Sequence, residues 1–157
     1  MQKNLSTQEP ILNPMLAEIE ISYRPKMKPS EMPKVVTSGE AYMVLLQAFP
    51  SLEYREYFYI LCLNRNNRVL GYSQISIGGL SGTIADPKII MQTALKANAC
   101  SIIIAHNHPS GNLVPSEADK QITYKLKDAG KFLEIPVLDH LIMTSESYFS
   151  FADDGLI

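Results

Sequence analysis

Two histidines and one aspartate near the middle of the chain have the spacing of metal ligands. His106 and His108 are separated by one residue, and Asp119 follows after ten more. Two neutral imidazole nitrogens and one carboxylate oxygen suit Zn²⁺, and a catalytic zinc site keeps its fourth position for water. The sequence therefore predicts a zinc site with His106, His108 and Asp119 as its ligands.

The segments around these residues explain how the three side chains could meet. Residues 101–105 form an apolar run typical of a buried strand, so both histidines leave the strand end pointing the same way. Residues 109–112 predict a turn, and Ser116 predicts the N-cap of a helix with Asp119 in its first turn. A helix that returns from this loop would bring Asp119 back toward the histidines.

Each part of the motif also has a purely structural explanation. A serine followed three residues later by an acidic residue is typical of a helix N-terminus, so Ser116 can cap a helix whether or not Asp119 binds a metal. The two histidines could be hydrogen-bonded polar groups at a strand end. The complete spacing of all three residues favours the metal site.

The longer string H-N-H-P-S-G, followed by P-S-x-x-D, resembles the metal motif of the JAB/MPN metalloprotease domains and, more narrowly, of their bacterial RadC branch. The resemblance runs from about residue 38 to the C-terminus, where the D-H-L-I and Y-F-S-F segments also fit. It implies a JAB/MPN domain, whose fold is similar to that of cytidine deaminases. It also implies a zinc metallopeptidase or isopeptidase that cleaves an amide bond in a protein or peptide substrate with metal-activated water.

The same resemblance implies two catalytic residues besides the ligands. Family members use a glutamate at the start of the strand that follows the first helix; Glu56 holds that place, and Glu53 on the preceding loop is the alternative. Such a carboxylate takes a proton from water and passes it to the departing nitrogen. Ser116 would present its hydroxyl to the oxyanion of the tetrahedral intermediate.

Other metal chemistries fit the sequence less well. A zinc deaminase would need H-x-E with P-C-x-x-C, and a helical zincin would need H-E-x-x-H; neither motif is present. Asp139 and His140 lie inside an apolar run, where an unpaired polar group is costly. They could orient a ligand histidine or serve as hydrogen-bonded structural groups, and the sequence leaves both possibilities open.

Helices and strands are predicted to alternate along the chain. Ser38 is expected to cap the first helix, and Gly130 to stop the last one. The expected helices cover residues 38–49, 86–98 and 116–129, and the expected strands cover 57–63, 69–77, 101–106, 135–143 and 148–151. This order predicts the α/β class, with a three-layer architecture in which a mixed β-sheet carries helices on both faces.

The domain organisation follows from the position of these elements. Residues 1–35 are polar and punctuated by prolines, which predicts an N-terminal extension with one edge strand near residues 16–23; residues 36–157 form the metal-binding domain. The unpaired edge could make a homodimer. Residues 78–82 contain three glycines and predict a flexible connection.

Composition restricts the remaining classes of function. The 157 residues suffice for one domain, and a net charge of -2 shows no basic footprint for nucleic acid. No apolar run suggests a membrane span or signal peptide, and two cysteines without a C-x-x-C pair indicate reduced thiols, so we expect a cytoplasmic protein. The alternative function is a DNA-repair-associated or non-catalytic binding module of the RadC family, although residues 1–40 lack the helix-hairpin-helix signature of longer members.

Overall fold

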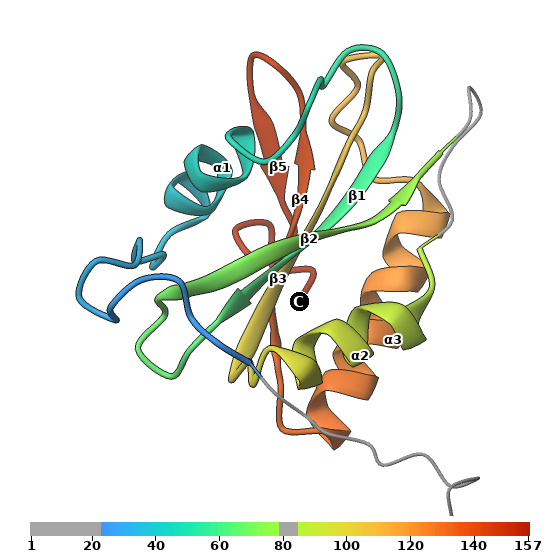
Figure 1. The fold of residues 1–157 in the computed structure, drawn as a ribbon. Coiled ribbons are helices and arrows are strands. Elements are labelled where there is room, and N and C mark those ends of the chain that lie inside the picture. The colour runs from blue at the N-terminus through green and yellow to red at the C-terminus, as the bar shows by residue number, and fades with distance from the viewer. Residues whose placement is uncertain (1–22, 79–84) are drawn as a thin grey trace, which may run out of the picture.

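A five-stranded mixed sheet with helices on both faces forms the domain, as Figure 1 shows. The computed structural model describes residues 23–78 and 85–157. In chain order the elements are α1 (Ser38–Leu46), β1 (Tyr57–Leu63), β2 (Val69–Ile77), α2 (Pro87–Lys96), β3 (Ser101–Asn107), α3 (Glu117–Phe132), β4 (Val137–Met143) and β5 (Tyr148–Ser150). The predicted α/β class and three-layer architecture are confirmed.

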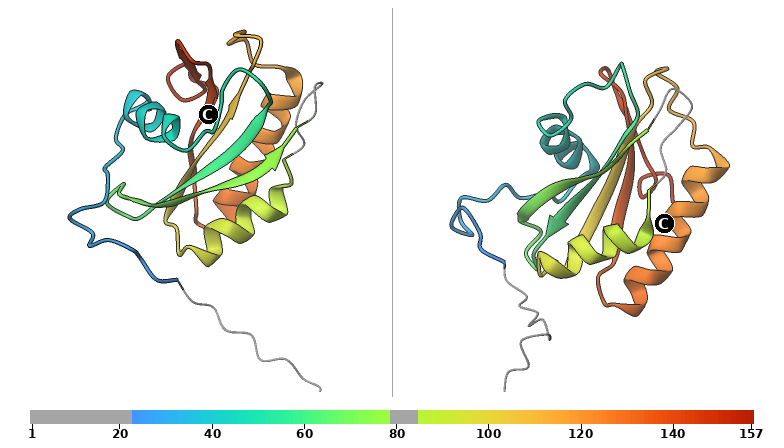
Figure 2. Two further views of the ribbon diagram at one scale, coloured as in Figure 1. Left: turned by 45° about the horizontal axis from the view of Figure 1, so that its top comes forward. Right: turned by 45° about the vertical axis from the view of Figure 1, so that its right-hand side comes forward.

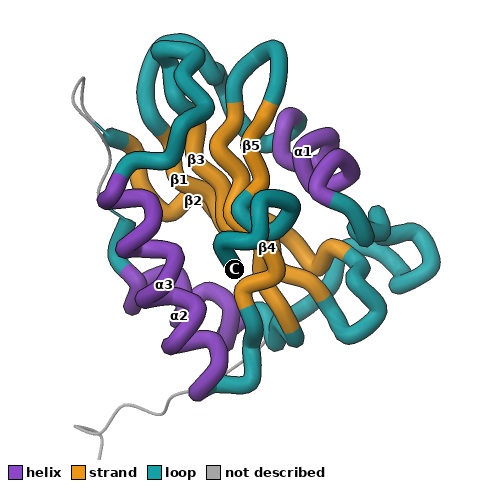
Figure 3. The backbone as a smooth tube through the Cα atoms, turned by 180° about the vertical axis from the view of Figure 1, so that it is seen from behind, coloured by secondary structure: helices purple, strands orange, loops and turns teal. Residues whose placement is uncertain are grey.

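The strand order in the sheet is β2-β1-β3-β4-β5. Strands β3 and β4 are parallel, with α3 connecting them, and the remaining neighbours are antiparallel. Because β1 runs against β3, the start of β1 lies at the same edge of the sheet as the end of β3. The loop from β3 to α3 leaves from that edge (Figure 3).

The central strands are apolar along their whole length because both of their faces are covered. Alternate residues of β1 enter two separate cores: Tyr59, Leu61 and Leu63 pack toward α1, whereas Phe58 and its alternating neighbours pack toward α2 and α3. Figure 2 shows α1 on one face of the sheet and the other two helices on the opposite face. A rigid, doubly covered strand β3 therefore carries His106 at its end.

The first helix begins one residue earlier than predicted. Thr37, not Ser38, is the N-cap: its hydroxyl accepts a hydrogen bond from the backbone N–H of Glu40, whose carboxylate accepts one from the N–H of Thr37. Only Thr37 has an acidic residue three positions later that completes this capping box. The hydroxyl of Ser38 donates instead to Asp153, 2.5 Å away. The helix also ends at Leu46, earlier than residue 49.

The prediction that Gly130 stops the last helix was wrong, because α3 continues to Phe132. Gly130 is buried, and a Cβ atom at this position would collide with the backbone carbonyl oxygen of Ile135. The glycine allows the chain to fold back closely over the helix end, and the N–H of Ile135 donates to the Gly130 carbonyl at 2.8 Å. The turn itself uses Glu134, with φ of 57°.

Some expectations fall partly or wholly outside the described residues. Of the predicted edge strand only Tyr23 is described, and its hydroxyl donates to the carbonyl of Leu70 at 2.8 Å. Of the predicted connection 78–82 only Gly78 is described. Both cysteines are free, and burial raises the pKa of Cys62 to about 12. Among the helices of residues 23–78 and 85–157, none combines the length and apolarity needed to cross a membrane.

Candidate metal centre

The three predicted ligands converge at the edge of the sheet where β3 ends. The Nε2 atoms of His106 and His108 lie 2.9 Å apart. Asp119, in the first turn of α3, places Oδ1 3.1 Å from Nε2 of His106 and Oδ2 3.7 Å from Nε2 of His108. The structure therefore brings together all three side chains that the sequence spacing selected.

The ring of His108 is held by the loop that follows it. Its Nδ1 lies 2.6 Å from the backbone carbonyl of Asn112. A carbonyl oxygen only accepts, so Nδ1 carries a hydrogen, and Nε2 is the nitrogen whose lone pair could bind a metal ion. Gly111, with φ of 78°, gives the loop the left-handed turn that brings Asn112 back to this ring.

Asp119 is held in place by the same residue that caps its helix. Both the backbone N–H and the hydroxyl of Ser116 donate to Oδ2 of Asp119, at 2.7 and 2.6 Å, and the N–H of Asp119 donates to the Ser116 hydroxyl at 3.1 Å. Burial alone would raise the pKa of Asp119, but hydrogen bonds with His106 and Ser116 outweigh it and hold this pKa well below the ordinary 3.8. The carboxylate is thus ionised and oriented.

Glu56 reaches the centre from the start of β1. Its Oε1 lies 4.0 Å from Nε2 of His108, and its ligand atom and those of His106 and His108 all lie within 4.8 Å of one another. Glu56, His106 and His108 are therefore a possible metal-binding group in their own right. Glu53, the alternative base, is exposed on the preceding loop and does not line the cavity at this centre.

Asn107 positions the loop that carries Glu56, a role that was not predicted from the sequence. Its side-chain nitrogen donates to the carbonyls of Leu52 and Arg55 at 2.9 and 2.7 Å, and its oxygen accepts from the N–H of Tyr57 at 2.7 Å. The residue is fully buried. Its position could have suggested this role. Asn107 is a polar amide between two histidines at the end of an apolar strand, and a buried amide must find hydrogen-bond partners.

The structure separates the roles of Asp139 and His140. Asp139 accepts hydrogen bonds from the backbone N–H of His140 and Ala152 and from the hydroxyl of Ser150. Its side chain therefore connects β4 with the end of β5 and the residues that follow it. His140 contacts a predicted ligand: its Nε2 lies 2.8 Å from Nδ1 of His106. Burial lowers the pKa of His140 well below 6.5.

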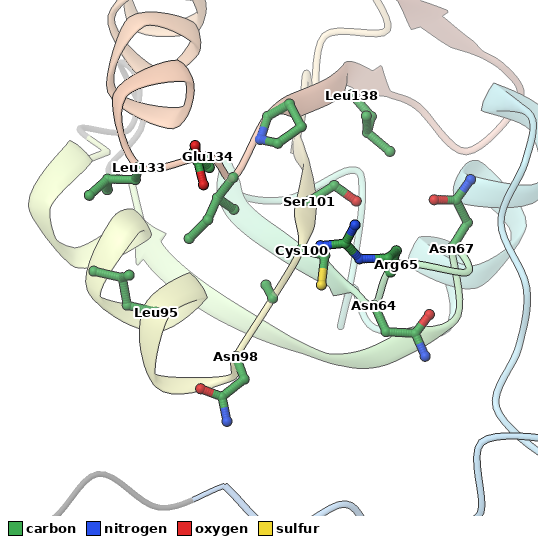
Figure 4. Close-up of a pocket in the computed structure, with 13 residues that line it drawn as sticks. Asn64, Arg65, Asn67, Leu95, Asn98, Cys100, Ser101, Leu133, Glu134 and Leu138 are labelled. Atoms are coloured by element: carbon green, nitrogen blue, oxygen red, sulfur yellow. The ribbon is translucent and has the colours of Figure 1, made fainter.

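A cavity of about 220 Å³ opens beside the ligands and is lined by Glu56, Phe58, Ala85, His106, Ala118, Asp119 and Ile122. A larger hollow, of about 670 Å³, lies at the opposite edge of the sheet, where Cys100 precedes β3 and Ser101 begins it (Figure 4). Of these two cavities, only the smaller one gives access to the candidate metal centre.

The donor set fits a zinc ion. Two ligands held about 2.1 Å from a tetrahedral zinc lie roughly 3.4 Å apart, and the three distances among His106, His108 and Asp119 are 2.9, 3.1 and 3.7 Å. The two Nε2 atoms and the carboxylate face one another, and all three can present lone pairs to one point when each histidine carries its hydrogen on Nδ1. Three potential ligand atoms at these distances suit a cation placed between them.

Comparison with known proteins places the chain in a family. Residues 35–156 match the family described as RadC-like JAB domain. A "UPF0758 protein" of Flavobacterium johnsoniae is 39% identical over 143 residues, which cover 90% of this chain and 62% of the relative. Another, from Chlorobium chlorochromatii, is 37% identical over 91% of this chain and 64% of its own length.

The chain spans less than two thirds of the length of these relatives, and in a relative from Thermosynechococcus vestitus, 39% identical, the matched part is 54% of the protein. The match includes the whole described sheet and every residue of the candidate centre. The chain therefore belongs to the family of RadC-like JAB domains.

Proposed function

We propose that this domain is a zinc-dependent hydrolase that cleaves an amide bond, as a metallopeptidase or isopeptidase. The observation that carries the proposal is the convergence of His106, His108 and Asp119 beside a cavity whose wall also holds Glu56. Three protein ligands with a free carboxylate nearby are what hydrolysis by a catalytic zinc site requires.

The distances favour Asp119 as the third ligand and Glu56 as the base. Asp119 lies closer to both histidines and is fixed by two hydrogen bonds from Ser116, as a ligand should be. Glu56 is 4.0 Å from the nearer histidine nitrogen and borders the cavity, where a water molecule and a substrate could both reach it.

A zinc ion in this site would polarise the substrate carbonyl and lower the pKa of a water molecule toward neutrality. Glu56 would take a proton from a water molecule as its oxygen attacks the carbonyl carbon, and would deliver this proton to the nitrogen as the C–N bond breaks. The hydroxyl of Ser116 can turn from Asp119 to donate to the developing oxyanion, because the backbone N–H of Ser116 keeps its own bond to the carboxylate.

The size of the cavity suits a polymeric substrate. Its volume of about 220 Å³ is below the range of roughly 300–1,000 Å³ that encloses a whole small ligand. The scissile bond and an adjoining side chain fit inside, while the rest of an extended protein or peptide chain lies across the opening. This supports a protein or peptide substrate over a free metabolite.

The test begins with metal content and continues with cleavage. Mass spectrometry of protein purified without added metal should give about one zinc per wild-type chain and much less for His108→Ala. A peptide library should then be cleaved by the wild type and by Glu53→Gln, the matched exposed control, but not by Glu56→Gln. Equal cleavage by Glu56→Gln would contradict its role as the base.

Two outcomes would overturn the proposal more broadly. Wild-type protein that takes up no zinc even when zinc is supplied in excess cannot be a zinc hydrolase. Zinc uptake without cleavage of any library member would favour the non-catalytic or DNA-associated module, and a gel shift at about 50 mM salt, where phosphate contacts are strongest, would then test DNA binding.

A further inference from the structure

A chain of buried hydrogen bonds connects α3, β4 and β3 behind the candidate metal centre. The hydroxyl of Thr123 lies 2.5 Å from the backbone carbonyl of Asp119 and 2.6 Å from Nδ1 of His140. The other nitrogen of His140 lies 2.8 Å from Nδ1 of His106. Thr123 and His140 are fully buried and His106 nearly so, at 1% exposed, so the chain is isolated from solvent.

The direction of every hydrogen in this chain follows from its first member. The carbonyl of Asp119 can only accept, so Thr123 donates its single hydroxyl hydrogen to it. The oxygen of Thr123 must then accept from His140, which places the hydrogen of His140 on Nδ1. The backbone carbonyl of Asp119 on α3 thereby determines which nitrogen of His140 on β4 faces Thr123 with a hydrogen.

The ring of His140 is enclosed by other side chains. It stacks on Phe151, with centroids 4.7 Å apart and planes 15° from parallel, and its two nitrogens form hydrogen bonds only with Thr123 and with Nδ1 of His106. The contact with Thr123 already places a hydrogen on Nδ1, and among the described residues no carboxylate or carbonyl faces Nε2 to accept a second one. Its Nε2 is therefore an acceptor, and the hydrogen between the two rings belongs to Nδ1 of His106.

We propose that His140 and Thr123 are positioning residues that hold His106 in the tautomer whose Nε2 lone pair is free to bind the metal ion. This proposal rests on the metal site of the proposed function and adds to it. The series of hydrogen bonds begins and ends at the same residue, because the backbone carbonyl bound by Thr123 and the carboxylate beside His106 both belong to Asp119. One residue thus supplies one ligand and orients another.

Without this chain, His106 could adopt either tautomer, and the carboxylate of Asp119, 3.1 Å from Nε2, would favour the one with its hydrogen on Nε2. In the wrong one, Nε2 carries the hydrogen and points it at the site where the metal must bind, so the ligand is lost. His108 needs no such relay, because the Asn112 carbonyl accepts directly from its Nδ1. Within the described part of the chain, the hydrogen bonds of the His106 ring include no backbone carbonyl. Nε2 of His140 takes the place of such a carbonyl as the acceptor for Nδ1 of His106.

The sharpest test uses two nearly isosteric variants of Thr123. Thr123→Val removes the hydroxyl and keeps the shape, whereas Thr123→Ser keeps the hydroxyl and serves as the matched control. Zinc affinity is measured by competition with a chelator of known affinity. We expect Thr123→Val to bind zinc roughly 10–100-fold more weakly, and Thr123→Ser to bind within about threefold of the wild type.

A second pair of variants changes the middle of the chain. Glutamine at position 140 can accept from His106 and donate to Thr123, as the histidine does, whereas leucine can do neither. We therefore expect His140→Gln to recover most of the zinc affinity that His140→Leu loses. Thermal unfolding identifies any variant that fails to fold. If a His140 variant does not fold, the comparison of Thr123→Val with Thr123→Ser tests the proposal. Equal affinities for Thr123→Val and Thr123→Ser would overturn the proposal.

A spectroscopic measurement separates this inference from the proposed function. Proton–nitrogen correlation NMR of metal-free protein labelled with ¹⁵N-histidine, at about pH 8, reports which ring nitrogen of His106 carries the hydrogen. The hydrogen is expected on Nδ1, and finding it on Nε2 would overturn the relay even if zinc binds. Failure of the wild type to bind zinc would overturn the hydrolase instead, because this measurement needs no metal.

Discussion

Nε2 of His106 lies 3.1 Å from Oδ1 of Asp119, so the end of strand β3 and the first turn of α3 meet at one point. The contact joins a buried imidazole to a carboxylate whose other oxygen is held by Ser116. His106 and Asp119 are oriented by different elements of the fold, so the distance between them is set before any metal ion binds. A preorganised pair of this kind is what a tight metal site needs.

Asp119→Asn should remove metal binding and leave the fold intact. The amide oxygen can still accept from the N–H of Ser116, so the helix keeps its cap, but the negative charge that offsets the metal is gone. We expect zinc content to fall at least about tenfold, measured by mass spectrometry with thermal unfolding in parallel. Asp128→Asn, on the exposed side of the same helix, is the matched control and should keep its zinc. A full complement of zinc in Asp119→Asn would exclude this carboxylate as a ligand.

Asn107→Leu should destabilise the protein and displace the base. The change leaves the carbonyls of Leu52 and Arg55 and the N–H of Tyr57 without their buried partner. Each unsatisfied buried group costs about 1–3 kcal/mol, so a loss of roughly 3 kcal/mol or more in the free energy of unfolding is expected.

Urea unfolding of Asn107→Leu measures that loss directly. Leucine at the exposed turn position Asn66 is the control, and it should change the free energy of unfolding by less than about 0.5 kcal/mol. A similar small effect at Asn107 would mean that the loop carrying Glu56 is held by other contacts.

Gly130→Ala should destabilise the protein although alanine is the better helix former. The added Cβ atom meets the carbonyl oxygen of Ile135 at a distance that real structures avoid, and this oxygen is backbone that cannot rotate away. Overpacking of about 1–3 kcal/mol exceeds the gain of about 1 kcal/mol in helix propensity. Gly71→Ala, where the new atom meets nothing within 4 Å, should be close to neutral in the same thermal unfolding experiment.

The capping box of α1 should make stability depend on pH in the acid range. Hydrogen bonds from the backbone N–H groups of Val36 and Thr37 lower the pKa of Glu40 below its ordinary value of 4.5. The unfolded chain therefore binds more protons than the folded one between these two pKa values, and the stabilisation is lost as the pH falls through this window. It is fully present above 4.5.

Thermal unfolding of wild type and Glu40→Gln at several pH values checks this effect. The wild type should be the more stable protein near neutral pH, and the difference should shrink as the pH falls below about 4.5. A difference that stays constant down to about pH 3 would show that the carboxylate charge contributes nothing at this helix end.

Local patterns in the sequence determined most of the elements and the ligand set. The expected strands 57–63 and 69–77 have the bounds found for β1 and β2, and the helix expected from residue 86 begins at Pro87 with Asp86 as its N-cap. The spacing of His106, His108 and Asp119 selected three side chains that do converge. These features are set by neighbours a few residues away, where periodicity and capping operate.

Contacts between distant segments were decided only by the tertiary structure. Gly130 looked like a helix stop because its packing partner, Ile135, approaches only when the chain folds back. Asn107 and Thr123 looked like ordinary polar residues because the groups they bind lie in other elements or one helical turn away. The neutral ring of His140 also depends on burial from several elements at once, which no local pattern in the sequence specifies.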